Sequence, residues 1–419
     1  MYALVDCNNF FVSAERVFRP DLRNRPVCVL SNNDGCIVAL SNEAKAIGLA
    51  RGNPLFKVRD IVARCNVTIF SANFSLYAGM SSRVMHVMAE DFPNMEIYSI
   101  DEAFLPIDGL KNDEILLKMR ELKAKLWRWT GIPVSIGIAQ TKTLAKVAGH
   151  YAKKFPGYQG VCMIDSEVKR QKALQRIPVS DIWGIGRQSR KKLDAANVFS
   201  AWDFTQMSES WVQQHFGISG VKTRRELNGI PCVEASEIET KQSICTSRSF
   251  GKTVAEEEEL LASIVEFTTT CAQKLRAQHS VANMLSIFIS TDRFKEELPQ
   301  YKQYATTKLT VGTADTSELI GYAKRLLAAI FRPGFQYKRA GVILAGITDD
   351  AVVQQNLFDG VENRERRQLL FQTIDKINQG DGGRVKFAIQ GQNDAKWRSR
   401  KEFCSPNYLG NIDELMKVK

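Results

Sequence analysis

The first 164 residues alternate between short apolar runs and segments whose apolar residues recur at helical spacing. The apolar runs predict buried strands, which we place at residues 1–6, 25–32, 96–107, 133–139 and 160–164. The intervening segments predict helices at residues 9–18, 42–48, 113–129 and 141–154. We expect 96–107 to form two strands around a tight turn. With residues 20–94 set aside as an insertion, residues 1–139 follow the order β-α-β-β-α-β, which is typical of a ferredoxin-like sheet.

The rest of the chain changes character twice. Residues 178–230 indicate short helices with tryptophans and glycines, and a polar, linker-like stretch follows them. A second β-α-β-β-α-β order comes next, with strands at 244–254, 282–291, 306–313 and 340–347 and helices at 256–279 and 316–331. Residues 349–419 are polar and in places rich in glycine, so we expect them to be ordered only in part. The fold class is therefore α+β, in several domains.

Two adjacent carboxylates, Asp101 and Glu102, interrupt the apolar run at 96–107. Burying such charges without partners costs roughly several kcal/mol. In the expected topology the first strand lies beside the third, so Asp6 at the end of the first strand comes close to this turn. The alternative is that the pair forms an exposed turn and that Asp6 only caps a strand.

A carboxylate cluster without histidine or cysteine favours hard cations, and Mg²⁺ is the usual choice when the substrate is a phosphate. Two such ions about 3.5–4 Å apart would activate an attacking hydroxyl and steady a leaving pyrophosphate. If the three acids meet, the sequence predicts a centre for phosphoryl transfer.

Composition narrows the class of protein. The formal net charge of +11 indicates a polyanionic partner such as nucleic acid, although a basic surface without a partner fits the charge equally well. The nine cysteines include no CxxC pair and the chain has only four histidines, so a zinc site and a disulfide framework are both improbable. We expect a cytoplasmic protein in a reducing compartment. No signal peptide and no membrane-spanning run are evident.

Basic side chains elsewhere suit a phosphate-bearing ligand. Lys45 lies in the helix at 42–48, and Lys153 and Lys154 end the helix at 141–154, although single lysines are usually solvated. The segment WGIGRQSRKKL (183–193) has glycines that would let backbone amides at a helix start face a phosphate. The residues that would grip a nucleic-acid backbone without reading its sequence are Gly184, Gly186, Arg187, Arg190, Lys191 and Lys192.

The motifs together resemble the Y-family translesion DNA polymerases, and within them the DNA polymerase V branch. The resemblance runs over nearly the whole chain, through DCNNFF, FRPDL, LSNNDGC, EIYSIDEAF, GIAQTKTLAK, WGIGRQSRKKL, CTSRSFG and QNLFD. SIDEAF together with an N-terminal Asp and an aromatic gate is highly specific for the family. The resemblance implies an error-prone DNA polymerase of the SOS response to DNA damage, without a proofreading exonuclease.

The resemblance also implies roles for single residues. Asp6, Asp101 and Glu102 match the metal-binding acids, with the carbonyl of Cys7 as a further ligand of two Mg²⁺ ions, for which Mn²⁺ could substitute. Phe11 matches the steric gate that would clash with a 2′-hydroxyl, at a position where many relatives have Tyr. The remaining residues assigned to the nucleotide site are Phe10, itself expected in the core, Lys45 and Lys153. Asn42 stands where many relatives have Tyr, and its contact with the nucleotide stays open.

The family's hand-like architecture implies the domain limits. A ferredoxin-like palm would take residues 1–19 and 95–170, small fingers 20–94, and a thumb with a helix-hairpin-helix 171–232. A linker at 233–242 would lead to a β-α-β-β-α-β little finger at 243–348, whose Arg248 would lie near template phosphates, and a tail at 349–419 would follow.

The tail carries the segment QQNLF, which fits a sliding-clamp-binding peptide. Leu357 and Phe358 would enter an apolar pocket and Gln354 would bond to its rim. The polymerase V likeness further implies a processed UmuD-type dimer and the recombinase RecA as partners, alongside primer–template DNA and dNTP. Two other functions stay open from the sequence: a polymerase IV-like enzyme without UmuD-type subunits, and a non-catalytic DNA-binding protein.

Overall fold

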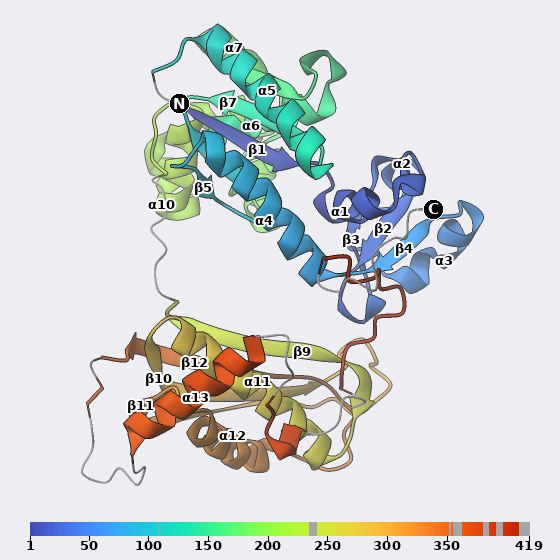
Figure 1. Ribbon diagram of the computed structural model, residues 1–419. Helices are drawn as coiled ribbons and strands as arrows, with labels where there is room; N and C mark the ends of the chain where they lie inside the picture. The colour runs from blue at the N-terminus through green and yellow to red at the C-terminus, as the bar shows by residue number, and fades with distance from the viewer. Residues whose placement is uncertain are drawn as a thin grey trace. The chain divides into compact units, whose positions relative to one another are not determined.

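The structure is a computed structural model that describes residues 1–107, 109–233, 241–351, 353–354, 363–379, 385–390 and 397–409. The chain divides into two compact units (Figure 1). The first unit consists of Met1–Ser236 with Glu402–Lys419, and the second is Glu237–Lys401. The chain therefore leaves the first unit once and returns to it near residue 402.

A five-stranded sheet forms the centre of the first unit, in the order β5-β6-β1-β7-β8. Its strands are β1 (Tyr2–Cys7), β5 (Glu96–Ile97), β6 (Glu102–Pro106), β7 (Val134–Ala139) and β8 (Val161–Ile164). β1 runs antiparallel to both β6 and β7, and β8 extends the sheet parallel to β7. The predicted ferredoxin-like order and the predicted neighbourhood of the first and third strands are both confirmed.

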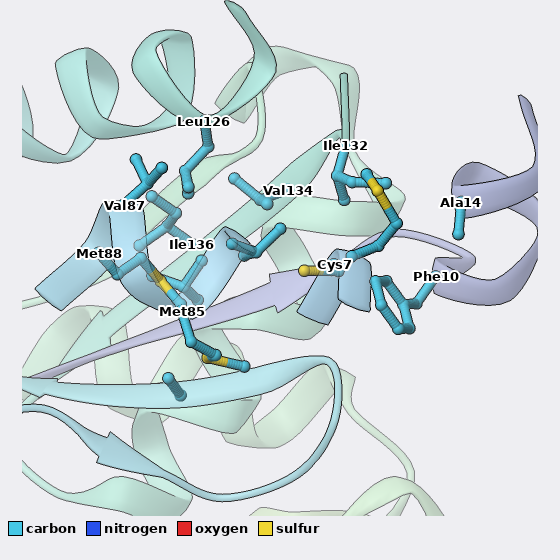
Figure 2. Packing of buried hydrophobic residues seen from close by; sticks show 14 of the residues in the cluster. Cys7, Phe10, Ala14, Met85, Val87, Met88, Leu126, Ile132, Val134 and Ile136 are labelled. Carbon is cyan, nitrogen blue, oxygen red and sulfur yellow. The ribbon is translucent and has the colours of Figure 1, made fainter. Parts of the chain in front are cut away.

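Helices cover both faces of this sheet. The helices α1 (Phe10–Phe18), α4 (Phe74–Asp91) and α5 (Asn112–Thr130) share one hydrophobic core with the sheet. Figure 2 shows Met85 and Met88 of α4 and Leu126 of α5 gathered around Val134 and Ile136 of β7. The opposite face packs against α6 (Lys142–Lys154), through residues such as Leu4 and Phe104. Because side chains alternate along a strand, neighbouring residues of β1 enter different cores.

The position of α6 is tightly constrained. A Cβ atom on Gly137 of β7 would lie only 2.7 Å from the Cα of Gly149, so glycine here permits backbone-to-backbone contact between strand and helix. The hydroxyl of Thr141 caps the helix by accepting a hydrogen bond from the Leu144 amide at 3.2 Å. The buried Glu226 carboxylate accepts another from the Thr143 amide at 2.9 Å. A carboxylate at a helix N-terminus is favourable, so α6 is fixed at its start and along its length.

The insertion between α1 and β5 has its own small sheet, in the order β3-β2-β4. Its strands are β2 (Val27–Leu30), β3 (Ile37–Leu40) and β4 (Thr68–Ser71), and its helices are α2 (Asn42–Ala46) and α3 (Leu55–Arg64), with 3-10 turns at Pro20–Leu22 and Asn32–Asp34. A separate cluster that includes Leu30, Ile37 and Leu55 forms its core.

Helices dominate the rest of the first unit. After a turn at Pro156–Tyr158 they are α7 (Glu167–Arg176), α8 (Arg187–Ala195), α9 (Ala201–Gln206) and α10 (Glu209–Leu227), with a 3-10 turn at Val179–Asp181. They pack against the α6 face of the sheet through residues such as Leu174, Leu193 and Phe204. The helices expected between 178 and 230 are thus present.

The second unit contains an antiparallel sheet in the order β11-β10-β12-β9. The strands are β9 (Ser243–Val254), β10 (Ser280–Thr291), β11 (Lys302–Thr313) and β12 (Tyr337–Asp349), and the helices α11 (Glu257–Ala277) and α12 (Thr316–Ile330) share its core. Each element of the predicted second β-α-β-β-α-β order is confirmed.

Residues after β12 contribute structure to both units. The helix α13 (Arg364–Gln379), which the sequence did not predict, lies against α11 and α12 (Figure 1). Three ion pairs hold it: Arg276–Asp375 at 2.7 Å, Arg367–Asp315 at 2.6 Å and Arg364–Glu318 at 3.2 Å. A short turn at Ala388–Gln390 and the buried Trp397 complete the described part of the second unit.

Two expectations from composition concern covalent and membrane structure. All nine cysteines are free, so the chain is held together without disulfides, as predicted. Within the described residues, no helix combines the length and the apolar character needed to cross a bilayer.

Candidate active site

Asp6 and Glu102 lie side by side at the ends of neighbouring strands. They are register partners in the β1–β6 ladder, and the Cys7 amide donates to the Asp101 carbonyl at 2.9 Å just beyond them. Leu4 and Phe104, two residues away on each strand, pack on the α6 face. Because side chains alternate, Asp6 and Glu102 face α6 as well. The predicted approach of the acidic turn to Asp6 is therefore observed.

Lysines of α6 reach these carboxylates. Lys153 forms an ion pair with Asp6, and Lys146 forms one with Glu102 at 2.7 Å. Lys142, about one helical turn before Lys146, pairs with Glu96 at 2.5 Å, although the Lys142 side chain is almost fully buried. The three lysines lie four and seven residues apart, which places them along one helix face. This helical spacing is visible in the sequence, but Lys146 and Lys142 were not among the residues predicted to belong to the site.

Burial and the lysines act on the two carboxyl groups in opposite directions. Burial raises the pKa of Asp6 to about 7, although the Lys153 ammonium works against it. Burial alone would also raise the pKa of Glu102, but the hydrogen bond and charge of Lys146 outweigh it and the pKa is lowered. A carboxyl group with the pKa of Asp6 gains strongly from a nearby cation, because the cation stabilises its ionised form.

Asp101 sits in a tight turn rather than in the strand. The amides of Tyr98 and Ser99 donate to the Glu102 carbonyl at 3.0 and 3.1 Å, which closes the turn between β5 and β6. The Ser99 hydroxyl donates to the Asp101 carboxylate at 2.7 Å. The three acids thus come from two strand ends and one turn, with Asp101 held by its own loop.

Aromatic rings enclose the ammonium of Lys146. It lies 4.4 Å from the ring centroid of Tyr98, 5.3 Å from that of Trp183 and 5.8 Å from that of Phe104. The Trp183 indole donates to the Tyr98 hydroxyl at 3.0 Å. Such contacts favour a cation over the ring faces, so Lys146 is held beside Glu102. Trp183 belongs to the WGIG motif, which thus connects the helical segment to the acidic turn.

The thiol of Cys7 is not suited to hold a metal. Cys7 points into the core on the other face of the sheet, near Phe10 in Figure 2. Its burial, reinforced by the charge of Asp6, raises the pKa of the thiol far above the ordinary value. The side chain therefore stays a protonated core residue, and any role of Cys7 in holding a metal would fall to its carbonyl.

Two cationic side chains from other parts of the chain lie near Lys45. Lys45 of α2 has a lowered pKa because it is partly buried and because Lys153 and Arg51 lie near. Asn9 accepts a hydrogen bond from Lys45 at 2.7 Å and donates one to Asn42 at 3.1 Å. The predicted pair of Lys45 and Lys153 is thus brought together. Arg51 and Asn9 were missed, since neither belongs to a periodic pattern.

The two phenylalanines at the start of α1 have different environments. Phe10 is buried in the core, as expected, whereas Phe11 is only partly buried. The Phe11 ring stacks on Tyr77 of α4 with centroids 4.4 Å apart and meets the edge of Phe74 at 6.1 Å. One face of Phe11 is therefore supported by α4.

The residues predicted to contact DNA are solvent-exposed. Gly186 precedes the first residue of α8, Arg187, so the helix starts where the sequence analysis placed it. Gly184 has a φ of 89°, a conformation that favours glycine. The exposed residues of this group are Gly184, Gly186, Arg187, Arg190, Lys191 and Lys192. Arg248 is exposed on β9, the edge strand of the second unit.

The proposed clamp motif is described only in part. Gln354 is exposed shortly after the end of β12. Leu357 and Phe358 lie outside the residues that the structure describes.

The donor chemistry of the acidic centre fits a hard divalent cation. Asp6, Asp101 and Glu102 supply carboxylate oxygens, and the Cys7 carbonyl adds a neutral oxygen donor. Among the described residues, no three His, Cys, Asp or Glu side chains converge as a preformed cage. Two of the three carboxylates instead pair with Lys153 and Lys146. The residues therefore fit a divalent cation whose binding would bring the carboxylate side chains together.

Family models match most of the chain. The impB/mucB/samB family model matches residues 5–150, and the model of the same family's C-terminal domain matches residues 241–357. A third model, Domain of unknown function (DUF4113), matches residues 368–418.

Relatives align over nearly the whole chain. Protein UmuC of Salmonella typhimurium is 41% identical and covers 100% of both chains. Protein MucB of Escherichia coli is 37% identical over 97% of each, and a DNA polymerase IV of Pelotomaculum thermopropionicum is 27% identical over 87% of this chain and 89% of its own.

Solved structures share the fold. A Y-family DNA polymerase chimera of Dbh and Dpo4 superposes with a TM-score of 0.66 at 19% identity, covering 83% of this chain and 99% of its own. An insertion ternary complex of Dbh DNA polymerase gives 0.54 at 20% identity, with the same coverages. The predicted α+β architecture is therefore confirmed, and the chain belongs to the impB/mucB/samB family, on the fold of the Y-family DNA polymerases.

Proposed function

We propose that this chain is an error-prone translesion DNA polymerase that adds deoxynucleotides to a primer 3′ end during the SOS response to DNA damage. Full-length identity of 41% to a protein UmuC supports this assignment, against 27% to a DNA polymerase IV. The observation that carries the chemistry is the pairing of Asp6 with Glu102 across β1 and β6, with Asp101 in the adjoining turn. Carboxylates in that arrangement suit metal-assisted phosphoryl transfer.

Asp6, Asp101, Glu102 and the Cys7 carbonyl would hold two Mg²⁺ ions, for which Mn²⁺ can substitute. When bound, the cations supply charge neutralisation for the primer hydroxyl and for the pyrophosphate that leaves. Asp6 and Glu102 would then ligate metal in place of their present ion pairs with Lys153 and Lys146. Lys153 would turn to the triphosphate together with Lys45 and Arg51, which already share its electrostatic environment.

Phe11 would act as the steric gate of the nucleotide site, with the buried Phe10 beneath it as a supporting residue. Its ring is rigidly supported from one side by Tyr77, which suits a residue that excludes a 2′-hydroxyl by shape. The hydroxyl group is small, so exclusion depends on the ring holding its position to within a fraction of an ångström.

The exposed start of α8 would hold the DNA backbone. Its residues Gly186, Arg187 and Arg190 combine outward backbone amides with positive charge, and Arg248 would add a contact from the second unit. Such contacts carry no sequence information, which suits an enzyme that copies any template.

The partners of this polymerase would be primer–template DNA, dNTP, the sliding clamp through Gln354, Leu357 and Phe358, a processed UmuD-type dimer and RecA. The likeness to protein UmuC supports the last two. If the purified chain were as active alone as with the UmuD-type dimer, the polymerase IV-like alternative would replace this proposal.

Asp101→Asn tests the catalytic centre and separates an enzyme from a DNA-binding protein without activity. The variant keeps the shape of the side chain but weakens a metal ligand, so we expect primer extension to fall by at least about a hundredfold. Primer–template affinity should stay unchanged, because the substitution leaves the exposed basic residues at the start of α8 intact. Asp91→Asn, at the exposed end of α4, is the matched control and should extend normally. Normal extension by Asp101→Asn would refute the two-metal centre.

A further inference from the structure

Residues 402–409, here called the strap, run across the first unit although they follow the whole second unit in the chain. The strap is hydrogen-bonded to Ser71, the last residue of β4. The Ser71 amide donates to the Phe403 carbonyl at 2.9 Å, and the Phe403 amide donates to the Ser71 hydroxyl at 2.9 Å. The Glu402 amide donates to Asp34 at 2.7 Å. The strap lies within the part of the chain that matches the domain of unknown function.

Side chains anchor the strap on α1 and α4. Tyr408 is buried and stacks on Phe18 of α1, with centroids 4.5 Å apart and planes 5° from parallel. Leu409 packs where Gly79 of α4 leaves room, since a Cβ there would lie 2.5 Å from the Leu409 side chain. Asn73, which caps α4, donates to the Ser405 hydroxyl at 3.0 Å. The strap therefore joins the two helices that carry Phe11 and its supporting ring.

A continuous set of contacts connects the strap with the ring of Phe11. The buried Ser405 hydroxyl donates to the Glu15 carboxylate at 3.2 Å, and the Tyr77 hydroxyl donates to the same oxygen at 2.8 Å. Glu15 and Tyr77 are both fully buried. The Tyr77 ring then stacks on Phe11 at 4.4 Å, with planes 13° from parallel. Only Glu15 and Tyr77 stand between Ser405 and Phe11.

We propose that the strap positions the Phe11 ring through Ser405, Glu15 and Tyr77, and thereby sets how strictly the polymerase discriminates between deoxyribose and ribose. This inference rests on the proposed role of Phe11 as the steric gate. Ser405, Glu15 and Tyr77 are positioning residues, because each acts through another side chain. The buried Glu15 has no reason to occupy an apolar core on packing grounds, whereas it fits as the acceptor that joins two hydroxyl donors.

The experiment measures single-nucleotide insertion of dCTP and of CTP opposite template dG by the full chain, with one fixed set of accessory proteins. The readout is the ratio of kcat/KM for the two sugars. A loss of folded or active enzyme lowers both values equally and leaves the ratio unchanged, so the ratio isolates positioning from stability. Phe11→Ala establishes the gate, and its failure to lower the ratio would refute the proposed function of Phe11 rather than the strap.

Three variants then test the strap. Ser405→Ala removes the hydrogen bond to Glu15 and the one from Asn73, and Tyr77→Phe removes the hydrogen bond to Glu15. Each should lower the ratio about two- to tenfold. Tyr408→Ala removes the anchor on Phe18 and should lower it on the order of tenfold. The matched control is Cys404→Ser, an exposed strap position, which should keep the wild-type ratio. Glu15→Gln retains an acceptor oxygen and should lie near wild type, whereas Glu15→Ala should resemble Tyr77→Phe.

Combining the variants with Phe11→Ala gives the decisive comparison. If the strap acts through the ring, Ser405→Ala and Tyr408→Ala should have no further effect on the ratio once the ring is gone. If Phe11→Ala collapses the ratio but the strap variants retain the wild-type value, the gate stands and the strap proposal is overturned. Equal effects with and without the Phe11 ring would also overturn it, because the strap would then act elsewhere.

Discussion

Gly137→Ala would displace α6 from the sheet and with it the lysines of the active site. The added Cβ would lie 2.7 Å from the Gly149 Cα and closer still to the backbone of the same helix, where no side chain can move aside. Carbon atoms in contact are about 3.5–4.0 Å apart, so α6 must move outward by about 1 Å. Lys146 and Lys153 move with it, away from Glu102 and Asp6.

The magnitude follows from the packing of this helix. A gap of about 0.5–1 Å forfeits a quarter to a half of each dispersion contact, and overpacking of this kind costs about 1–3 kcal/mol, here at the upper end because backbone meets backbone. For a unit of this size that corresponds to a fall in unfolding temperature of about 6–12 °C. A displacement of about 1 Å at catalytic groups can also reduce kcat/KM about a hundredfold.

The assay combines thermal unfolding with single-turnover insertion of a correct dNTP. Gly157→Ala is the matched control, because a Cβ there meets nothing within 4 Å just beyond the end of α6. An unfolding temperature for Gly137→Ala equal to that of the control would show that α6 is not seated on β7 as described. A destabilised variant with normal insertion would refute the link from helix position to the lysines.

Three further predictions concern charge and a partner. Burial raises the pKa of Glu15 to about 7, so the folded state holds more protons than the unfolded state and stability falls as pH rises from about 4.5 to 7, by about 3 kcal/mol in all. Glu15→Gln should lack this fall. The measurement is the difference between the unfolding midpoints of wild type and Glu15→Gln as a function of pH, and a difference that does not change with pH would contradict the prediction. Lys153→Ala should raise the KM for dNTP about 10- to 100-fold, the value of one charged hydrogen bond, and leave primer–template affinity unchanged in a binding titration. Leu357→Ala combined with Phe358→Ala should abolish stimulation by the clamp in primer extension, and a variant that is still stimulated would show that the clamp binds elsewhere.

The central sheets could be predicted because their strands are apolar and their order follows a known pattern. The meeting of Asp6 with Glu102 followed from that order, since the first and third strands of such a sheet are neighbours. The second unit was predicted element by element for the same reason. The helix start at Arg187 followed from the glycines before it.

Other parts carried too little local signal. The strands β3 and β4 have four residues each, and α4 mixes polar and apolar residues, so neither shows a clear period. The lysine stripe of α6 is visible in the sequence, but only the structure shows which face meets the carboxylates. The contact of Ser405 with Glu15 spans 390 positions, and no local pattern relates residues so far apart.

The position of the strap in the chain has a consequence for protein synthesis. Residues 1–236 leave the ribosome long before residues 402–409, and at about 5–20 residues per second the delay is roughly eight to thirty-five seconds. Throughout that interval the nascent first unit lacks Tyr408 and Leu409 over Phe18 and Gly79. Its apolar surface stays open to chaperones and proteases until the strap arrives. A chain whose translation stops before residue 402 therefore keeps this apolar surface of the first unit uncovered.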